Sequence, residues 1–245
     1  MKFFTKIFAD GAKKDEILAL YKNQSISGFT TNPTLMKKAG VTDYKMFALN
    51  ILSVIKDKPI SLEVFSDEFD EMEQQALEMS KWGKNVIIKI PVMNTRGESS
   101  VDLIKKLSLS GVKINTTAIM TIDQVKSVLP SLEGGPKAYV SVFAGRIADA
   151  GIDPVPVMKE ILYLLKEYPN IELVWASPRE VYNIVQANDI KCHIITVTND
   201  LLKKLPLIGK DLNEFSLDTV KMFYNDAKEA GYKIEYSRNK ILAQY

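Results

Sequence analysis

Short runs of β-branched and aromatic residues alternate with segments of helical periodicity along this chain. The strand-like runs are residues 3–9, 27–31, 60–64, 85–90, 113–117, 137–143, 171–176 and 192–197. Apolar residues at helical spacing predict helices near residues 13–22, 43–56, 67–82, 99–109, 121–129, 154–168, 179–188 and 214–230. Because each pair of neighbouring parallel strands needs a crossover connection, this eightfold alternation predicts an α/β fold with a parallel sheet.

Eight strand–helix units fit a closed (β/α)8 TIM barrel better than an open doubly wound sheet, although the pattern alone is compatible with both. No linker interrupts the series, and the glycine- and proline-containing stretches at 134–136 and 151–154 are short connections. We therefore predict one barrel domain over residues 1–231. Residues 232–245 fall outside the eight units, and we expect a tail, a final helix or an arm that packs on a neighbouring subunit.

Composition narrows the function classes without naming one. The chain has 245 residues, 32 basic against 30 acidic side chains and a net charge of +2, so its bulk charge points to neither nucleic acid nor membrane. Cys192 is the single cysteine, which excludes an intrachain disulfide. The first ten residues lack the long apolar run of a signal peptide. We expect a cytoplasmic protein.

Polar residues gather where the predicted strands end. Barrel enzymes place their active sites at the carboxyl ends of the strands. The residues found there, one to three per strand, are Asp10, Thr30, Thr31, Asn32, Glu63, Lys89, Asn115, Thr117, Ser141, Phe143, Ser177 and Arg179. This distribution predicts a site at that end of the barrel.

Three ionisable residues interrupt apolar strands and are the candidates for catalysis. Lys89 breaks the run VIIKIPV, where it either reaches solvent or is enclosed; enclosure disfavours the ammonium form and frees the amine to attack a carbonyl. Glu63 could lie on an edge strand or pair structurally with Lys89. Asp10 could cap a helix or act as a general acid–base. Their combination on three strands favours a catalytic set.

A second cluster follows the sixth and seventh strands. Arg146, Ser177 and Arg179 have the chemistry of a phosphate site, because a guanidinium matches phosphate oxygens and the N-terminus of the next helix adds favourable dipoles. Each arginine could instead form a surface salt bridge. Barrels often bind phosphate after these strands, which favours the phosphate hypothesis.

Other chemistries find little support. Cys192 and His193 are neighbours on a predicted strand, so their side chains should point to opposite faces and cannot form a dyad. One cysteine and one histidine do not make a zinc set. The sequence contains no nucleophile elbow, GxGxxG or Walker A motif. We expect no metal and no cofactor.

Five ordered motifs resemble the transaldolase family, in particular its short members, which are related to fructose-6-phosphate aldolase. The motifs are GFTTNPT at 28–34, VIIKIP at 86–91, INTT at 114–117, SVFAGRI at 141–147 and ASPR at 176–179. The resemblance implies a class I mechanism, in which Lys89 forms a Schiff base with a ketose phosphate. Asp10 would act as the general acid–base, and Glu63 and Thr117 would hold a water that shuttles protons.

The resemblance also assigns substrate contacts. Hydroxyls of the three-carbon unit would be bound by Asn32, Asn115 and Ser141, and the phosphate by Arg146, Ser177 and Arg179. Thr31 and Phe143 complete the predicted substrate-binding set. The implied reaction transfers a dihydroxyacetone unit from a ketose phosphate to an aldose phosphate, in the pentose phosphate pathway or in a specialised biosynthesis. The implied partners are sugar phosphates and further copies of the chain, as a homo-oligomer, with no nucleic acid and no membrane.

Two positions bear on the choice between transfer and simple cleavage. In the aldolase branch of the family a tyrosine stands at the position of Phe143 and a glutamine at that of Glu63, so both residues favour transfer. An aldolase that releases dihydroxyacetone is the alternative, and a non-catalytic sugar-phosphate-binding barrel is another. The complete set of Asp10, Glu63 and Lys89 argues against the last, because binding needs no nucleophilic amine.

Overall fold

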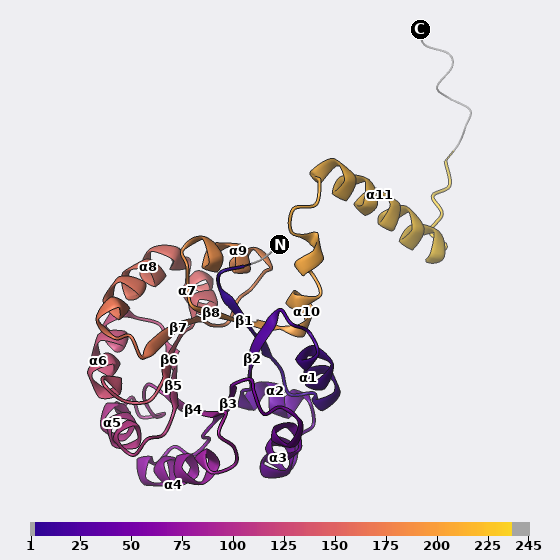
Figure 1. Cartoon of the computed structure of the whole chain (residues 1–245). Helices are drawn as coiled ribbons and strands as arrows, with labels where there is room; N and C mark the ends of the chain where they lie inside the picture. Colours follow the sequence, from indigo (N-terminus) through magenta and orange to yellow (C-terminus); the bar gives the residue numbers. More distant parts are fainter. Residues whose placement is uncertain (1–2, 237–245) are drawn as a thin grey trace. The chain divides into compact units, whose positions relative to one another are not determined.

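Eight parallel strands close into a barrel in the order of the sequence, in a computed structural model that describes residues 3–236. In Figure 1 the strands form an inner ring and the helices lie outside it. The strands are β1 (Lys6–Asp10), β2 (Ile26–Thr30), β3 (Ile60–Glu63), β4 (Val86–Pro91), β5 (Ile114–Ile119), β6 (Ala138–Val142), β7 (Ile171–Trp175) and β8 (Ile194–Thr198). The predicted (β/α)8 barrel is confirmed.

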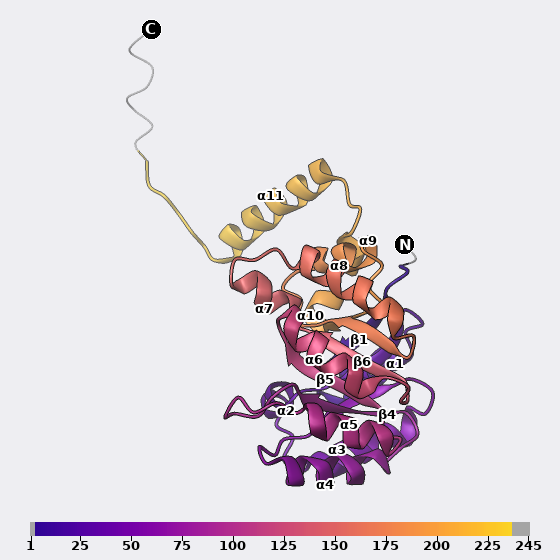
Figure 2. The same ribbon diagram turned by 90° about the vertical axis from the view of Figure 1, so that its left-hand side faces the viewer.

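The helices run alongside the strands on the outside of the barrel (Figure 2). They are α1 (Lys14–Tyr21), α2 (Pro33–Lys38), α3 (Tyr44–Val54), α4 (Phe69–Ser80), α5 (Val101–Leu109), α6 (Ile122–Leu132), α7 (Ala144–Asp149), α8 (Pro154–Leu164), α9 (Tyr182–Asp189) and α10 (Asn199–Leu202). The sequence pattern did not predict α2, α7 and α10. These helices have six, six and four residues, too few turns for a helical period to stand out.

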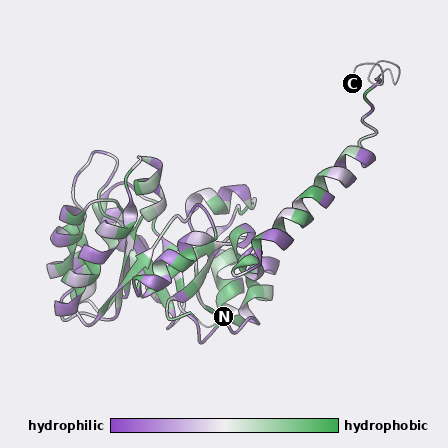
Figure 3. Ribbon diagram, turned by 90° about the horizontal axis from the view of Figure 1, so that it is seen from above, coloured by the Kyte–Doolittle hydropathy of each residue, from purple (hydrophilic) through white to green (hydrophobic). Residues whose placement is uncertain are grey.

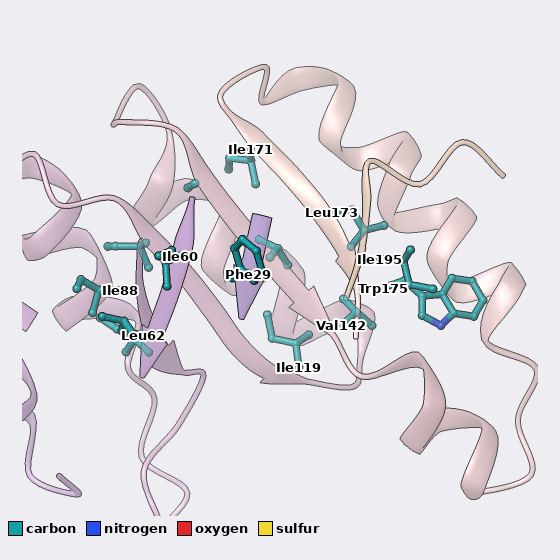
Figure 4. Packing of buried hydrophobic residues seen from close by; sticks show 14 of the residues in the cluster. Phe29, Ile60, Leu62, Ile88, Ile119, Val142, Ile171, Leu173, Trp175 and Ile195 are labelled. Carbon is teal, nitrogen blue, oxygen red and sulfur yellow. The ribbon is translucent and has the colours of Figure 1, made fainter. Parts of the chain in front are cut away.

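Strand side chains alternate between two cores. Those that face outward pack under the helices, and Figure 4 shows Phe29, Ile60, Leu173 and Trp175 in this layer, all almost fully buried. A smaller cluster inside the barrel consists of Phe8, Ile87, Tyr139, Val174 and Ile194. Figure 3 shows hydrophobic residues along the strands and hydrophilic ones on the outer helix surfaces. This arrangement fixes which strand positions reach the barrel interior.

Barrel closure also decides one alternative left open by the sequence. A closed sheet has no edge strand, and β3 pairs with β2 on one side and β4 on the other. Glu63, at the end of β3, is therefore not an edge residue facing solvent.

The chain divides into two compact units, Met1–Leu205 and Pro206–Tyr245. The second contains α11 (Leu212–Glu229), whose Asp211 side chain accepts hydrogen bonds from the backbone N–H groups of Asn213 and Glu214. This helix corresponds to the one expected at 214–230. The domain boundary after residue 231 stays a prediction, and residues 237–245 of the predicted tail lie outside the described part.

In residues 3–236 no helix has the length and apolarity to cross a bilayer.

Candidate active site

Strand register brings the predicted catalytic residues to one end of the barrel. Glu63 of β3 is paired in register with Lys89 of β4, and Lys89 in turn with Asn115 of β5. On the other side Asp10 of β1 is paired with Thr30 of β2. Because parallel strands in register point equivalent side chains the same way, these residues converge on the barrel interior.

A cavity of about 440 Å³ lies at the carboxyl ends of the strands, large enough for a small organic ligand. Its lining includes most of the residues predicted from the sequence: Asp10, Asn32, Glu63, Lys89, Thr117, Ser141, Phe143, Arg146, Ser177 and Arg179. Thr31 and Asn115 are buried beside the cavity but do not line it. Both contact a residue that does: the Thr31 carbonyl oxygen accepts from Lys89, and Asn115 Oδ1 accepts from Ser141. Their predicted contact with a substrate stays a prediction.

Lys89 is enclosed, with 7% of its surface exposed. Its Nζ donates to a Glu63 carboxylate oxygen at 2.9 Å and to the Thr31 carbonyl oxygen at 2.9 Å. The structural ion pair that the sequence left as an alternative is therefore present. It does not exclude a reactive amine, since the carboxylate that pairs with an ammonium can also accept a proton from it.

Asp10 faces the same cavity at the end of β1. Its carboxylate accepts a hydrogen bond from the Thr30 hydroxyl at 2.7 Å and one from the Asn32 amide at 3.4 Å. Burial raises the pKa of Asp10 above its ordinary value, and the positive charge of Lys89 and the Thr30 hydrogen bond partly offset that rise. Asp10 does not cap α1, whose first turn follows Lys13. A carboxyl of raised pKa in a cavity is suited to carry a proton in both directions.

Glu63 is held by its backbone as well as by Lys89. The Tyr44 hydroxyl of α3 accepts from the Glu63 N–H at 2.9 Å and donates to the Glu63 carbonyl at 3.1 Å. Burial raises the pKa of Tyr44, which keeps the phenol protonated and able to donate. Tyr44 thus fixes the backbone of Glu63, and the carboxylate points at the lysine.

Thr117 has a buried hydroxyl that makes no hydrogen bond within the described residues. Next to it, Ala118 has a φ of 61°, and the β5–β6 register shifts between Thr116 and Ile119. A residue with a side chain rarely adopts positive φ, and such strain and bulges concentrate at functional sites. The irregular strand therefore presents an unpaired polar group to the cavity, which suits the binding of water or substrate.

Ser141 and Asn32 have part of their hydrogen-bonding capacity committed within the protein. The Ser141 hydroxyl donates to Asn115 Oδ1 at 2.7 Å, and the Asn115 amide donates to the Ser61 hydroxyl at 3.2 Å. Asn32 Oδ1 caps α2 by accepting from the Leu35 N–H at 2.9 Å. Each nevertheless lines the cavity, so a lone pair of Ser141 and an amide N–H of Asn32 can face a ligand.

The two arginines of the predicted phosphate cluster have different surroundings. Arg179 pairs through Nε and Nη2 with both carboxylate oxygens of Asp149 at the end of α7, the Nε contact being 3.0 Å. Arg146 forms no ion pair within residues 3–236, and its guanidinium lies 5.9 Å from the centre of the Phe143 ring. Arg146 therefore carries the less compensated charge at the cavity.

Ser177 is held in an unusual conformation by close packing against α7. Its φ is 60°, in the left-handed region. A Cβ added to Gly145 would lie 1.6 Å from the Ser177 carbonyl oxygen, so only glycine permits the approach of these two backbones. Gly145 thus determines where the loop after β7 carries Ser177 and Arg179.

We expect Gly145→Ala to damage the phosphate side of the cavity, because backbone rather than a flexible side chain opposes the new methyl group. Unfolding should require about 2 kcal/mol less free energy, and the half-saturating concentration of a phosphorylated substrate should rise at least about tenfold. Chemical denaturation and initial-rate kinetics measure both. Gly134→Ala controls for a loss of stability alone, since a Cβ there meets no atom within 4 Å and only the positive φ of 65° opposes it; it should lower stability but leave saturation unchanged. A Gly145→Ala protein with unchanged stability and saturation would contradict the role of this contact.

Two threonines of β8, Thr196 and Thr198, line the cavity although the sequence did not single them out as site residues. The Thr196 hydroxyl is hydrogen-bonded to that of Thr30, which was expected at the end of the second strand and also lines the cavity. The signal was present in IITVT at 194–198, where threonines alternate with apolar residues and reach the carboxyl end of the strand. Within residues 3–236, no three His, Cys, Asp or Glu side chains gather in a group that could hold a metal ion.

Fold and cavity together define a (β/α)8-barrel protein with a buried lysine among carboxylates and arginines at the carboxyl ends of its strands. The family model Transaldolase/Fructose-6-phosphate aldolase matches residues 7–244. The chain belongs to this family, and the resemblance seen in its motifs is confirmed.

Sequence similarity to individual proteins is consistent with membership of this family. A protein of Dehalococcoides mccartyi named probable transaldolase is 34% identical over 217 residues, 87% of this chain and 97% of that protein. Another probable transaldolase, of Thermoanaerobacter sp., is 34% identical over 230 residues, 94% of this chain and all of that protein. Among solved structures, a phosphonomutase from Burkholderia cenocepacia described as putative is 8% identical with a TM-score of 0.55, covering 91% of this chain and 94% of that one. This last likeness concerns the fold alone.

Proposed function

We propose that this protein is a transaldolase that transfers a dihydroxyacetone unit from a ketose phosphate to an aldose phosphate through a Schiff base on Lys89. The observation that carries the proposal is the enclosed Lys89 amine, 2.9 Å from a Glu63 carboxylate oxygen in a cavity that Asp10 also lines. The names of the relatives support the same reaction.

The first half of the reaction prepares the imine. Glu63 takes a proton from the Lys89 ammonium, and the neutral amine attacks the ketone carbon, forming a carbon–nitrogen bond while the carbonyl oxygen gains a proton. Loss of that oxygen as water leaves a protonated imine. A water held between Glu63 and the unpaired Thr117 hydroxyl would carry the protons of these steps.

Carbon–carbon cleavage and transfer follow on the same lysine. Asp10 removes a proton from the hydroxyl next to the breaking bond; the bond's electron pair moves into the imine, and an aldose phosphate leaves. The three-carbon enamine stays attached to Lys89. It then attacks the aldehyde of the acceptor, whose oxygen takes the proton back from Asp10, and hydrolysis of the new imine releases the product ketose.

The phosphate of donor and acceptor would bind at Arg146, Ser177 and Arg179, on the side of the cavity beyond β6 and β7. Binding energy from this distant group can position the reacting carbons. Because Arg179 is paired with Asp149, a phosphate there must share its guanidinium with a carboxylate, whereas Arg146 has no such competitor within residues 3–236.

Phe143 favours transfer over release of dihydroxyacetone. Its ring lines the cavity, and an apolar ring cannot hold a water that would protonate the enamine carbon, the step that must precede hydrolysis of the imine. The enamine then persists until an acceptor aldehyde arrives. Glu63, which can exchange protons with Lys89 where a glutamine could not, is consistent with this assignment.

The proposal is tested by an assay with fructose 6-phosphate as donor, with and without erythrose 4-phosphate. We expect glyceraldehyde 3-phosphate to appear at a rate that depends on the acceptor, with little free dihydroxyacetone. Phe143→Tyr should raise free dihydroxyacetone release about tenfold, because a phenol can hold a water that protonates the enamine carbon before the imine is hydrolysed. If the native protein releases the same amount of dihydroxyacetone with and without acceptor, it is an aldolase. If no product forms under either condition, the protein is a non-catalytic sugar-phosphate-binding barrel.

We further propose that the protein acts in the cytoplasm, in pentose phosphate metabolism, as a homo-oligomer without nucleic acid or membrane. Support for assembly comes from α11 taken by itself. It buries none of its residues, and Leu212, Phe215, Val220 and Phe223 are exposed along one side at helical spacing. Such a stripe is typical of a helix that packs against another protein surface.

A further inference from the structure

A second cavity opens at the amino ends of the strands, opposite to the candidate active site. Its volume is about 350 Å³, enough for a small ligand. The segments that line it immediately precede β3, β4, β5 and β6, whose other ends carry Glu63, Lys89, Thr117 and Ser141. Nothing in the proposed transfer reaction uses this end of the barrel.

Positive charge dominates the mouth of this cavity. Lys56, Lys84, Lys113 and Lys137 line it, against the single carboxylate of Asp57. The Tyr21 hydroxyl donates to Asp57 at 2.8 Å, and this hydrogen bond lowers the pKa of Asp57, so the carboxylate is ionised. Four ammonium groups facing one carboxylate attract anions.

Neighbouring groups compensate these lysines unequally. Lys137 pairs with Glu172 at 2.9 Å, and Glu172 also binds Lys6. Lys113 donates to the Lys84 carbonyl oxygen at 2.7 Å, which holds its ammonium in place without neutralising it. Within residues 3–236, Lys56, Lys84 and Lys113 form no ion pair with a carboxylate. Three cations at the rim are therefore available to a ligand.

The floor of the cavity, its inner lining, is mostly apolar. Ile87 and Tyr139 belong to the cluster inside the barrel and are each 3% exposed, Pro59 is half-buried, and the lysine stems add further apolar surface. Asn85 also lines the cavity, but its amide donates to the Ile55 and Lys58 carbonyl oxygens. The Tyr139 ring packs edge-on against Phe8 at 5.8 Å, which fixes its orientation. Its hydroxyl makes no hydrogen bond with another side chain in the described residues, and burial raises its pKa, so it remains a donor.

We propose that this cavity binds a small organic phosphate that bears a ring, of the nucleoside-phosphate class. The ring covers Pro59, Ile87 and Tyr139, and the phosphate meets Lys56, Lys84 and Lys113. Inorganic phosphate alone would leave the apolar floor uncovered, while an uncharged ring would leave the lysines uncompensated. The combination of an apolar floor and a cationic rim selects a ligand that has both parts.

The test uses calorimetric titration of the full-length protein with adenosine 5′-monophosphate and, separately, inorganic phosphate at the same ionic strength. We expect the nucleotide to bind at least about tenfold more tightly than phosphate, because only it covers the floor. The double variant Lys84→Gln/Lys113→Gln should weaken nucleotide binding at least about tenfold. Tyr139→Phe should weaken it by about threefold, since one hydrogen bond is lost. Circular dichroism checks that each variant is folded.

Two control variants test whether the nucleotide binds at this cavity. Lys105→Gln/Lys159→Gln makes the same charge change on exposed outer positions of α5 and α8, and it should leave binding unchanged. Arg146→Ala should also leave it unchanged, and loss of binding there would place the nucleotide in the active-site cavity and overturn the proposal. Equal affinities for nucleotide and phosphate, or equal weakening by the two lysine pairs, would overturn it as well. None of these outcomes depends on transaldolase activity.

Discussion

Replacing Lys89 with methionine is expected to abolish turnover, with a loss of at least about 10⁴-fold in kcat, because no other group in the cavity can form the imine. Methionine keeps an apolar stem of similar length, so the packing of β4 is preserved. Incubation of the native protein with fructose 6-phosphate and borohydride should add the mass of the reduced adduct at Lys89. The Lys89→Met protein should gain none, as peptide mass spectrometry would show.

The folded state of the Lys89→Met protein separates catalysis from structure. Lys89 pairs with Glu63, and removing one partner of an enclosed pair leaves an uncompensated charge. We expect a folded but less stable barrel, and Lys89→Met/Glu63→Gln should recover part of the loss. Lys106→Met, an exposed residue of α5 paired with Glu73, is the control and should retain full activity. If the native protein traps no adduct, or if the Lys89→Met protein is active, Lys89 is not the nucleophile.

Asp10→Asn is expected to have the second-largest effect. The amide cannot exchange the proton of the substrate hydroxyl, so kcat should fall by about 10² to 10⁴-fold while an adduct still forms on Lys89. Burial raises the pKa of Asp10. As the pH falls through this raised value, the carboxylate takes up a proton and can no longer act as a base, so donor cleavage declines on the acid side.

The pH profile of donor cleavage therefore assigns the role of Asp10. The acid limb should lie above the ordinary aspartate value of about 3.9 and should be absent from Asp10→Asn. Thr30→Val removes a hydrogen bond that lowers the pKa of Asp10, so the limb should move to higher pH while activity on the alkaline side is largely kept. An acid limb that persists in Asp10→Asn would mean that another group controls the profile.

Local sequence patterns were sufficient to predict the barrel and most of the residues that line the cavity. Runs of five to seven β-forming residues stood out because each strand is buried on both faces and is therefore almost continuously apolar. For the same reason a lysine in VIIKIP or a glutamate in ISLE was conspicuous. The short helices α2, α7 and α10 escaped notice, because their ends are set by loop packing and capping, as at Asn32, rather than by an apolar period.

Several site features depend on contacts between distant segments. The pairing of Arg179 with Asp149 joins the loop after β7 to the end of α7, and no spacing in the sequence indicates it. The left-handed Ser177 is equally a consequence of Gly145 thirty-two positions earlier in the chain. Such contacts arise from the side-by-side placement of β6 and β7.

The sequence by itself determined the strand–helix alternation, the family and the residues that reach the carboxyl ends of the strands, because these follow from periodicity and local motifs. Only the tertiary structure decided that the sheet closes, that Lys89 lies against Glu63, and which arginine has no carboxylate partner in the described residues. It also gathered four lysines from separate loops around the second cavity. The physical reason is that ion pairs and cavities depend on register and packing across the barrel, whereas periodicity records only whether each position is buried.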